Sequence, residues 1–118
     1  MMWLLLLALA GAPDQTAQDA GARAFQRCAA CHSMQAQDPR SPAPSLRSVF
    51  GRRAGAVEGF AYSDALRAAG RRGLVWDEAA LERFLSDPEA VVPGTAMPSQ
   101  GGSAAERAAV IAWLRQNR

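Results

Sequence analysis

The pentapeptide Cys28-Ala29-Ala30-Cys31-His32 constrains this 118-residue chain more than any other feature. It contains both cysteines and the single histidine of the sequence. Thiols three positions apart lie on one side of a helical turn, and an imidazole follows at the next position. This C-x-x-C-H spacing attaches haem, because the thiols reach two vinyl groups while the imidazole lies beneath the iron. We predict one covalent haem c, attached by Cys28 and Cys31 and ligated by His32.

Other uses of two cysteines and a histidine fit the sequence less well. A thioredoxin-like redox pair needs a strand and a βαβ context, which the pattern lacks. A zinc site needs a fourth ligand and a second cluster of cysteine or histidine. A structural disulfide remains open in an oxidising compartment, but it leaves His32 without a role.

The iron position opposite His32 requires a second ligand, and the chain has four methionines. Met1 and Met2 lie in the apolar terminus, and Met34 is held on the same side of the macrocycle as His32. Met97 follows a proline-containing stretch with little helical signal, and we predict that it is the second metal ligand. Histidine and methionine together favour a high potential and leave no open coordination site.

The amino-terminal segment is apolar and ends in small residues, as an export signal does. We predict a signal peptide over 1–12, a linker over 13–17 and one domain over 18–118. The run is shorter than the roughly 20 apolar residues that span a bilayer, so no permanent anchor is expected. The predicted location is the periplasm, with membrane association if the segment is not cleaved.

Composition excludes several other classes of protein. Hydrophobic residues make up 49% and charged residues 20%, which is typical of a globular domain and not of a disordered one. The net charge of +2 comes with arginine as the only basic residue type besides the histidine, and the arginines do not form a basic stripe interleaved with aromatic residues. No nucleic-acid partner is expected, and we expect a monomer.

The periodicity predicts an all-α domain. Apolar positions three and four apart predict a first helix over 18–28, and a proline- and glycine-rich loop follows over 33–61. Ser63 is a predicted N-cap for a short helix through Ala69, with Gly70 as its stop.

Three further starts are marked by capping residues. Asp77 caps a helix with an apolar stripe, and Asp87 followed by Pro88 predicts a single turn. Ser103 and Glu106 form a capping box before the last helix. So small a helical domain with so long a loop has a thin core, which a bound cofactor would fill.

These motifs, in this order, resemble a class I cytochrome c of the mitochondrial and small soluble bacterial type. The resemblance extends from Gly21 to Arg115. It implies a small cytochrome c fold, in which four to five short helices wrap around one covalently bound haem. Its landmarks are Gly21, Phe25, the Cys28–His32 motif, Pro44-Ser45-Leu46, Phe50-Gly51-Arg52-Arg53-Ala54-Gly55, Gly59-Phe60-Ala61-Tyr62-Ser63, Trp76, Pro93-Gly94-Thr95-Ala96-Met97 and Ile111-Ala112-Trp113-Leu114.

The resemblance also implies roles for residues around the haem. The carbonyl of Pro44 would accept the Nδ1 proton of His32, so that Nε2 faces the iron. Arg52, Tyr62 and Trp76 would hold a buried haem propionate, and Thr95 would be a further polar neighbour, because a buried carboxylate requires donors.

The first and last helices would cross where Gly21, Phe25 and Trp113 pack together.

Some positions depart from the family pattern. Phe84 stands where the family often has a tyrosine, and Glu89, Ala90 and Ala96 occupy a stretch where lysines would ring the haem edge. The resemblance therefore does not extend to guidance of partners by a positive haem face. The arginines that could form a displaced docking patch, or simply a scattered solvated face, are Arg52, Arg53, Arg67, Arg71 and Arg72.

The resemblance implies an exported one-electron carrier and not an enzyme. Transient partners would be a cytochrome bc complex as donor and a terminal oxidase, peroxidase or reaction centre as acceptor. One alternative is a dedicated electron-accepting subunit of a periplasmic dehydrogenase. Another is a haem protein with labile Met97 ligation that acts on peroxide or binds a diatomic gas.

Overall fold

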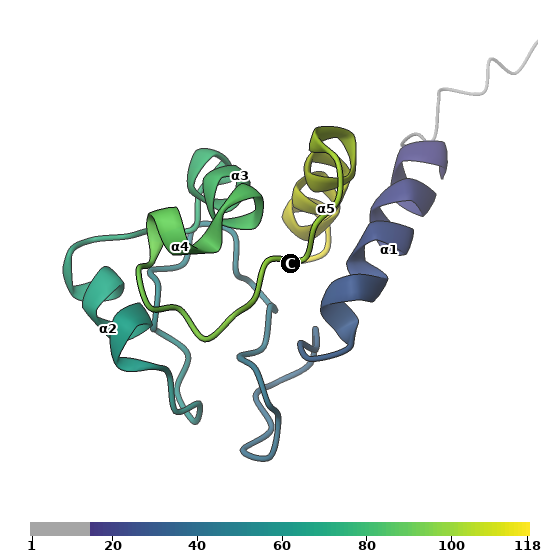
Figure 1. Ribbon diagram of the computed structural model, residues 1–118. Coiled ribbons are helices and arrows are strands. Elements are labelled where there is room, and N and C mark those ends of the chain that lie inside the picture. Colours follow the sequence, from purple (N-terminus) through teal and green to yellow (C-terminus); the bar gives the residue numbers. More distant parts are fainter. Residues whose placement is uncertain (1–14) are drawn as a thin grey trace, which may run out of the picture.

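The computed structural model describes residues 15–118, so the predicted signal peptide and the start of the linker lie outside the described part. Figure 1 shows α1 and α5 side by side, with α2, α3 and α4 grouped across the molecule. No described helix is long and apolar enough to cross a bilayer. The helices are α1 (Gln15–Ala29), α2 (Asp64–Arg71), α3 (Glu78–Ser86), α4 (Pro88–Val91) and α5 (Ala104–Gln116).

The predicted caps begin their helices. The side chain of Ser63 accepts a hydrogen bond from the amide of Leu66, and Asp77 caps α3 in the same way. Ser103 and Glu106 form the reciprocal capping box of α5. Each of these bonds satisfies an amide that has no partner within the first helical turn, which is why the sequence marks these starts clearly.

Two predicted helix limits are wrong. Helix α1 begins at Gln15 and so includes the end of the predicted linker. The side-chain amide of Gln15 donates a hydrogen bond to the carboxylate of Asp19, one turn further along the helix. Helix α2 continues through Gly70 to Arg71, and Gly73 is the glycine with positive φ, at 96°. Gly70 is instead required by close packing, because a Cβ there would overlap the carbonyl oxygen of Ala54.

Helices α1 and α5 cross at Gly21, as predicted. A Cβ at Gly21 would lie 2.5 Å from the Cβ of Trp113 and 2.9 Å from the carbonyl oxygen of Ala109. One turn further along α1, the ring of Phe25 stacks on Trp113 with 4.5 Å between ring centroids. The missing side chain therefore allows the two backbones to approach, and the aromatic pair fills the space beside the crossing.

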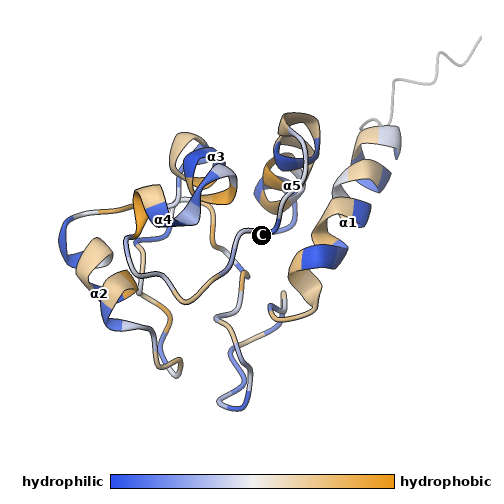
Figure 2. Ribbon diagram, viewed as in Figure 1, coloured by the Kyte–Doolittle hydropathy of each residue, from blue (hydrophilic) through white to orange (hydrophobic). Residues whose placement is uncertain are grey.

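The core is centred on α3, which contacts both α4 and α5. Val92 is fully buried just after α4, with Phe84 of α3 and Ile111 of α5 in the same cluster. Figure 2 shows hydrophobic segments on α3, α4 and α5. Because the chain is short, few residues are buried this completely, and much of the apolar surface instead lines a cavity.

The long segment between α1 and α2 is held in place by backbone hydrogen bonds to residues 74–76. The amide of Gly51 donates to the carbonyl of Trp76, and the amide of Trp76 donates to the carbonyl of Arg52. Arg53 and Val75 form an isolated antiparallel bridge. Apart from this bridge, residues 15–118 contain no β-strand. These bonds fix Arg52 and Trp76 next to each other without help from a helix.

Candidate functional site

The C-x-x-C-H motif occupies the end of α1. Cys28 lies in the last turn, and its carbonyl oxygen accepts hydrogen bonds from the amides of Cys31, at 3.1 Å, and His32, at 2.8 Å. These bonds wind the chain tightly past the helix end, and all three side chains line one cavity. Cys28 is partly buried and Cys31 is exposed, and both thiols are free. Burial raises the pKa of Cys28, and the nearby Arg27 charge lowers it in part.

The imidazole of His32 has a defined orientation. Its Nδ1 lies 2.7 Å from the carbonyl oxygen of Pro44. A carbonyl can only accept, so Nδ1 carries the proton and Nε2 keeps its lone pair. Burial lowers the pKa of His32, and the Arg52 charge acts in the same direction, whereas the bond to Pro44 raises it. The ring is thus favoured in the neutral form that binds metals.

The cavity has a volume of about 520 Å³ and mainly apolar walls. That size is typical of a site for an organic ligand. Leu81 and Phe84 of α3 and Val110 and Leu114 of α5 form part of its wall, and loop residues supply most of the rest.

Met97 lines the same cavity, although it is far along the chain from His32. It lies between α4 and α5, and its amide donates to the hydroxyl oxygen of Thr95 at 3.2 Å, which shapes the chain there. Both residues line the cavity, whereas Met34 packs against the hydrophobic core and is not part of the cavity wall. Among residues 15–118, the cavity therefore brings together one imidazole and one thioether.

The four polar residues predicted to surround a propionate also line this cavity. The guanidinium of Arg52 donates to the carbonyls of Ser45, at 2.9 Å, and Arg47, at 3.0 Å. The hydroxyl oxygen of Tyr62 accepts from the amide of Val57 at 3.0 Å, so its own proton is available to donate. Trp76 is buried beside Phe84, with 4.9 Å between ring centroids.

Arg52 carries an unbalanced charge inside the cavity. Its Nε is buried with no hydrogen-bond partner, and no acidic side chain of residues 15–118 lines the cavity. Burial lowers the pKa of Arg52, and its interaction with Tyr62 raises it. A buried donor without a partner is costly, so the cavity fits a ligand that carries a carboxylate. A haem, which is apolar with two propionates, matches these walls and this charge.

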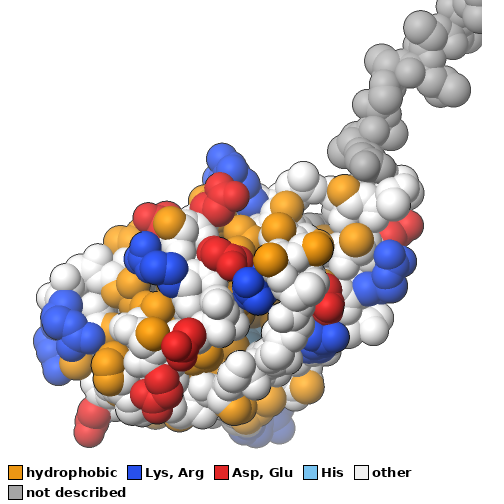
Figure 3. All heavy atoms as spheres, turned by 45° about the horizontal axis from the view of Figure 1, so that its top comes forward, with side chains coloured by type: hydrophobic (Ala, Val, Ile, Leu, Met, Phe, Trp, Pro, Cys, Tyr) orange, Lys and Arg blue, Asp and Glu red, His pale blue; other side chains and the backbone are white. Residues whose placement is uncertain are grey.

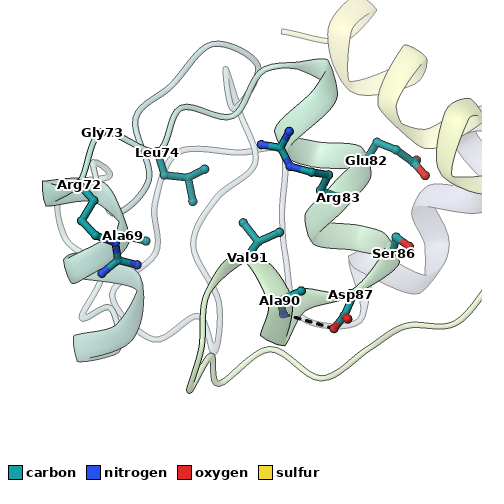
Figure 4. Close-up of a pocket in the computed structure, with 10 residues that line it drawn as sticks. All are labelled: Ala69, Arg72, Gly73, Leu74, Glu82, Arg83, Ser86, Asp87, Ala90 and Val91. Carbon is teal, nitrogen blue, oxygen red and sulfur yellow. Dashed lines mark hydrogen bonds between the residues drawn. The ribbon is translucent and has the colours of Figure 1, made fainter.

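A second hollow of about 700 Å³ lies among α2, α3 and α4. Figure 4 shows Leu74 and Val91 between Arg72 on one side and Arg83 on the other. No cysteine, histidine or methionine lines it. Elsewhere in residues 15–118, no group of three or more histidine, cysteine or acidic side chains is placed to hold a metal ion. Within residues 15–118, the side chains that could attach a haem and ligate its iron are therefore brought together in the first cavity.

Some residues in or next to the cavity wall were given no role at the site from the sequence. Ser45 and Arg47 orient Arg52 through backbone carbonyls, which leave no signal in the sequence. Leu66 of α2 and Phe60 complete the wall. Their apolar character is an ordinary core signal, so only the fold shows that they face a cavity.

Fold and site together define a class of protein: a small helical domain that encloses a haem at a C-x-x-C-H motif. The family model for cytochrome c matches residues 18–118. Cytochrome c2 of Rhodoblastus acidophilus is 42% identical over 83% of this chain and 90% of its own length. Cytochrome c2 of Blastochloris viridis is 37% identical over 96% of this chain and 88% of its own.

Solved structures agree with the sequence relatives. Cytochrome c2 of Rhodospirillum centenum superposes with a TM-score of 0.77 at 31% identity, over 84% of this chain and 96% of its own. Cytochrome cH of Methylobacterium extorquens has a TM-score of 0.73 at 37% identity, over 84% of this chain and 97% of its own. The chain therefore belongs to the cytochrome c family. It carries covalently bound haem c and is an electron-transfer protein, not an enzyme.

Proposed function

We propose that this protein is an exported electron carrier whose haem c is attached by Cys28 and Cys31 and ligated by His32 and Met97. Bound haem c supplies one-electron redox chemistry. Cys28 and Cys31 would hold the group through two thioether bonds, each made by adding a thiol across a vinyl group, which needs no oxidant. The observation that supports this assignment best is that both thiols, the oriented imidazole and the thioether line one cavity.

The residues of the cavity have different proposed roles. The carbonyl of Pro44 accepts from Nδ1 of His32, which would leave Nε2 to hold the iron. Arg52, Tyr62, Trp76 and Thr95 offer donors to a buried propionate. The apolar walls exclude water, which limits the reorganisation that accompanies a change of charge.

Membership of the family supports a proposal for the location and for the partners. We place the mature domain in the periplasm, with 1–12 acting as the export signal. A quinol-oxidising cytochrome bc complex is the proposed donor, and a terminal oxidase, peroxidase or reaction centre is the proposed acceptor. Contacts with such partners are brief and small, as is usual for redox encounters.

The axial ligand can be tested with two methionine variants of the holoprotein. Met97→Ala should abolish the sulfur-to-iron charge-transfer band of the oxidised protein and lower the reduction potential, because a thioether favours reduced iron. Met34→Ala is the matched control and should change neither property, since Met34 does not line the cavity. An unchanged spectrum and potential for Met97→Ala would refute the ligation.

A further inference from the structure

The hydrogen bond that orients His32 ends on a peptide group that is itself held at its other end. The carbonyl oxygen of Pro44 accepts from Nδ1 of His32 at 2.7 Å. The N–H of the same peptide group belongs to Ser45, and it donates to the side-chain oxygen Oε1 of Gln37 at 2.7 Å. One planar peptide group therefore links Gln37 to His32. We call Gln37, this peptide group and His32 the relay.

The side-chain amide of Gln37 fits the relay in one orientation only. The N–H of Ser45 can only donate, so it requires the oxygen Oε1. The nitrogen Nε2 faces two carbonyl oxygens, that of Asp38 at 3.0 Å and that of Ala43 at 3.5 Å. Exchanging oxygen and nitrogen would lose all three bonds. Gln37 is half-buried and Ser45 is 5% exposed, so water has little access to the bond between them.

Other hydrogen bonds hold Ser45 in place independently of Gln37. The hydroxyl of Ser45 donates to the carbonyl of Gln35, and its carbonyl accepts from the guanidinium of Arg52 at 2.9 Å. These bonds keep the segment in position when the side chain of Gln37 is changed. A substitution at Gln37 therefore tests the hydrogen bond to the peptide group and not the fold of the loop.

A hydrogen bond at one end of a peptide group changes the other end. Because the C–N bond has partial double-bond character, an acceptor on the N–H favours the resonance form with more negative charge on the carbonyl oxygen. The carbonyl of Pro44 then accepts more strongly and polarises Nδ1–H of His32 further. An imidazole polarised in this way is a more basic ligand at Nε2. A more basic ligand favours oxidised iron over reduced iron.

We infer that Gln37 is a positioning residue for His32, which strengthens the hydrogen bond from Nδ1 through the intervening peptide group and lowers the reduction potential of the haem. This inference rests on the proposed function, because it takes His32 as an iron ligand. The sequence gives no signal for this role, since Gln37 lies in a loop and its partner is a backbone amide eight residues further along the chain.

The relay acts without a charged side chain. Gln37 is uncharged, so replacing it with another uncharged residue leaves the electrostatic field at the haem as it was. On the face shown in Figure 3, arginine and acidic side chains are interspersed, with no broad patch of one sign. A single carboxylate added at the protein surface changes the field only slightly, because salt screens it. Variants with and without added charge can therefore be compared.

Two variants of the holoprotein separate the acceptor of Gln37 from its donor. Gln37→Leu removes both, so the Nδ1–H proton of His32 should move upfield in NMR spectra of the reduced protein. The same variant should raise the equilibrium constant for reduction roughly threefold, which is about 30 mV in a redox titration. Gln37→Glu keeps an oxygen for the Ser45 amide and loses the donor, so the proton should not move upfield and the potential should not rise.

Gln35 supplies the matched controls, because its exposed side chain takes no part in the relay. Gln35→Leu makes the same change two residues earlier and should leave both the Nδ1–H proton and the potential where they are. Gln35→Glu measures the effect of an added charge on the potential and should also leave the proton in place.

Three outcomes would overturn the inference. Gln37→Leu and Gln37→Glu would shift the Nδ1–H proton equally if only the Nε2 bonds mattered. Gln37→Leu would lower the potential if the loop opened and admitted water to the haem. The amide proton of Ser45 would move while Nδ1–H of His32 stayed if the peptide group transmitted nothing. The proposed function fails differently: the ring protons of His32 in the unmodified holoprotein would then lack the large ring-current shift of an axial ligand.

Discussion

The two sides of the haem cavity are built in different ways. On one side α1 and α5 cross in direct contact, with Gly21 against Trp113. On the other side Arg52, Thr95 and Met97 come from segments without helix, held by backbone hydrogen bonds and single side chains. The helical side can pack without a ligand, whereas the loop side has an apolar wall with nothing of its own to pack against. Residues of α1, α3 and α5 line the cavity as well, so the difference is one of degree: the loop side depends on haem more than the helix crossing does.

The largest effect is expected on removing haem altogether. Without haem, the apolar walls of a cavity of about 520 Å³ would face water, and they are a large part of the apolar surface that so small a domain can bury. The Cys28→Ser, Cys31→Ser double variant made without haem should lack near-ultraviolet circular dichroism and a cooperative melt, while keeping some helix. A sharp thermal transition in this apoprotein would show that the loop side is stable alone.

The helix crossing should be the next most sensitive feature. Gly21→Val should destabilise the holoprotein by about 2–3 kcal/mol in urea titrations, because its side chain would overlap Trp113 and force the helices apart. Ala22→Val is the control, since Ala22 is exposed on the same helix. Its only expected cost is the lower helix propensity of valine compared with alanine. Equal losses for the two variants would mean that close approach of the helices is unimportant.

Removing the buried charge tests the loop side. Arg52→Leu leaves the carbonyls of Ser45 and Arg47 without these donors, which costs about 1–3 kcal/mol. The loss of a positive charge at the haem also favours oxidised iron, so the reduction potential should fall. A fall of about 60 mV corresponds to a tenfold change for one electron. Arg53→Leu, at the exposed neighbouring position, should leave the potential unchanged in redox titration.

The smallest effect is expected at a helix cap. Ser103→Ala removes the side chain that accepts from the amide of Glu106 at 3.1 Å, and should cost about 1 kcal/mol in thermal unfolding. The potential should not move, because Ser103 does not line the cavity. Ser99→Ala, in the exposed segment before α5 and without a cap to lose, should have no measurable effect on stability. A changed potential in Ser103→Ala would mean that α5 transmits strain to the haem.

Predictions from the sequence succeeded where an interaction is local. The starts of α2, α3 and α5 were predicted because a capping side chain and its amide lie three residues apart. The end of α2 was not predicted correctly, because the role of Gly70 depends on Ala54, which approaches it from another segment. The early start of α1 was missed as well, since polar residues at a helix end give no periodic signal.

The sequence by itself determined the chemistry, because the C-x-x-C-H motif fits within one turn and its meaning does not depend on the rest of the chain. Elimination among the four methionines also predicts Met97 as the second ligand. Only the tertiary structure decided which residues share the cavity and that Arg52 is left with an unpartnered Nε. The physical reason is distance along the chain: charge and burial depend on neighbours that the fold brings together from remote segments.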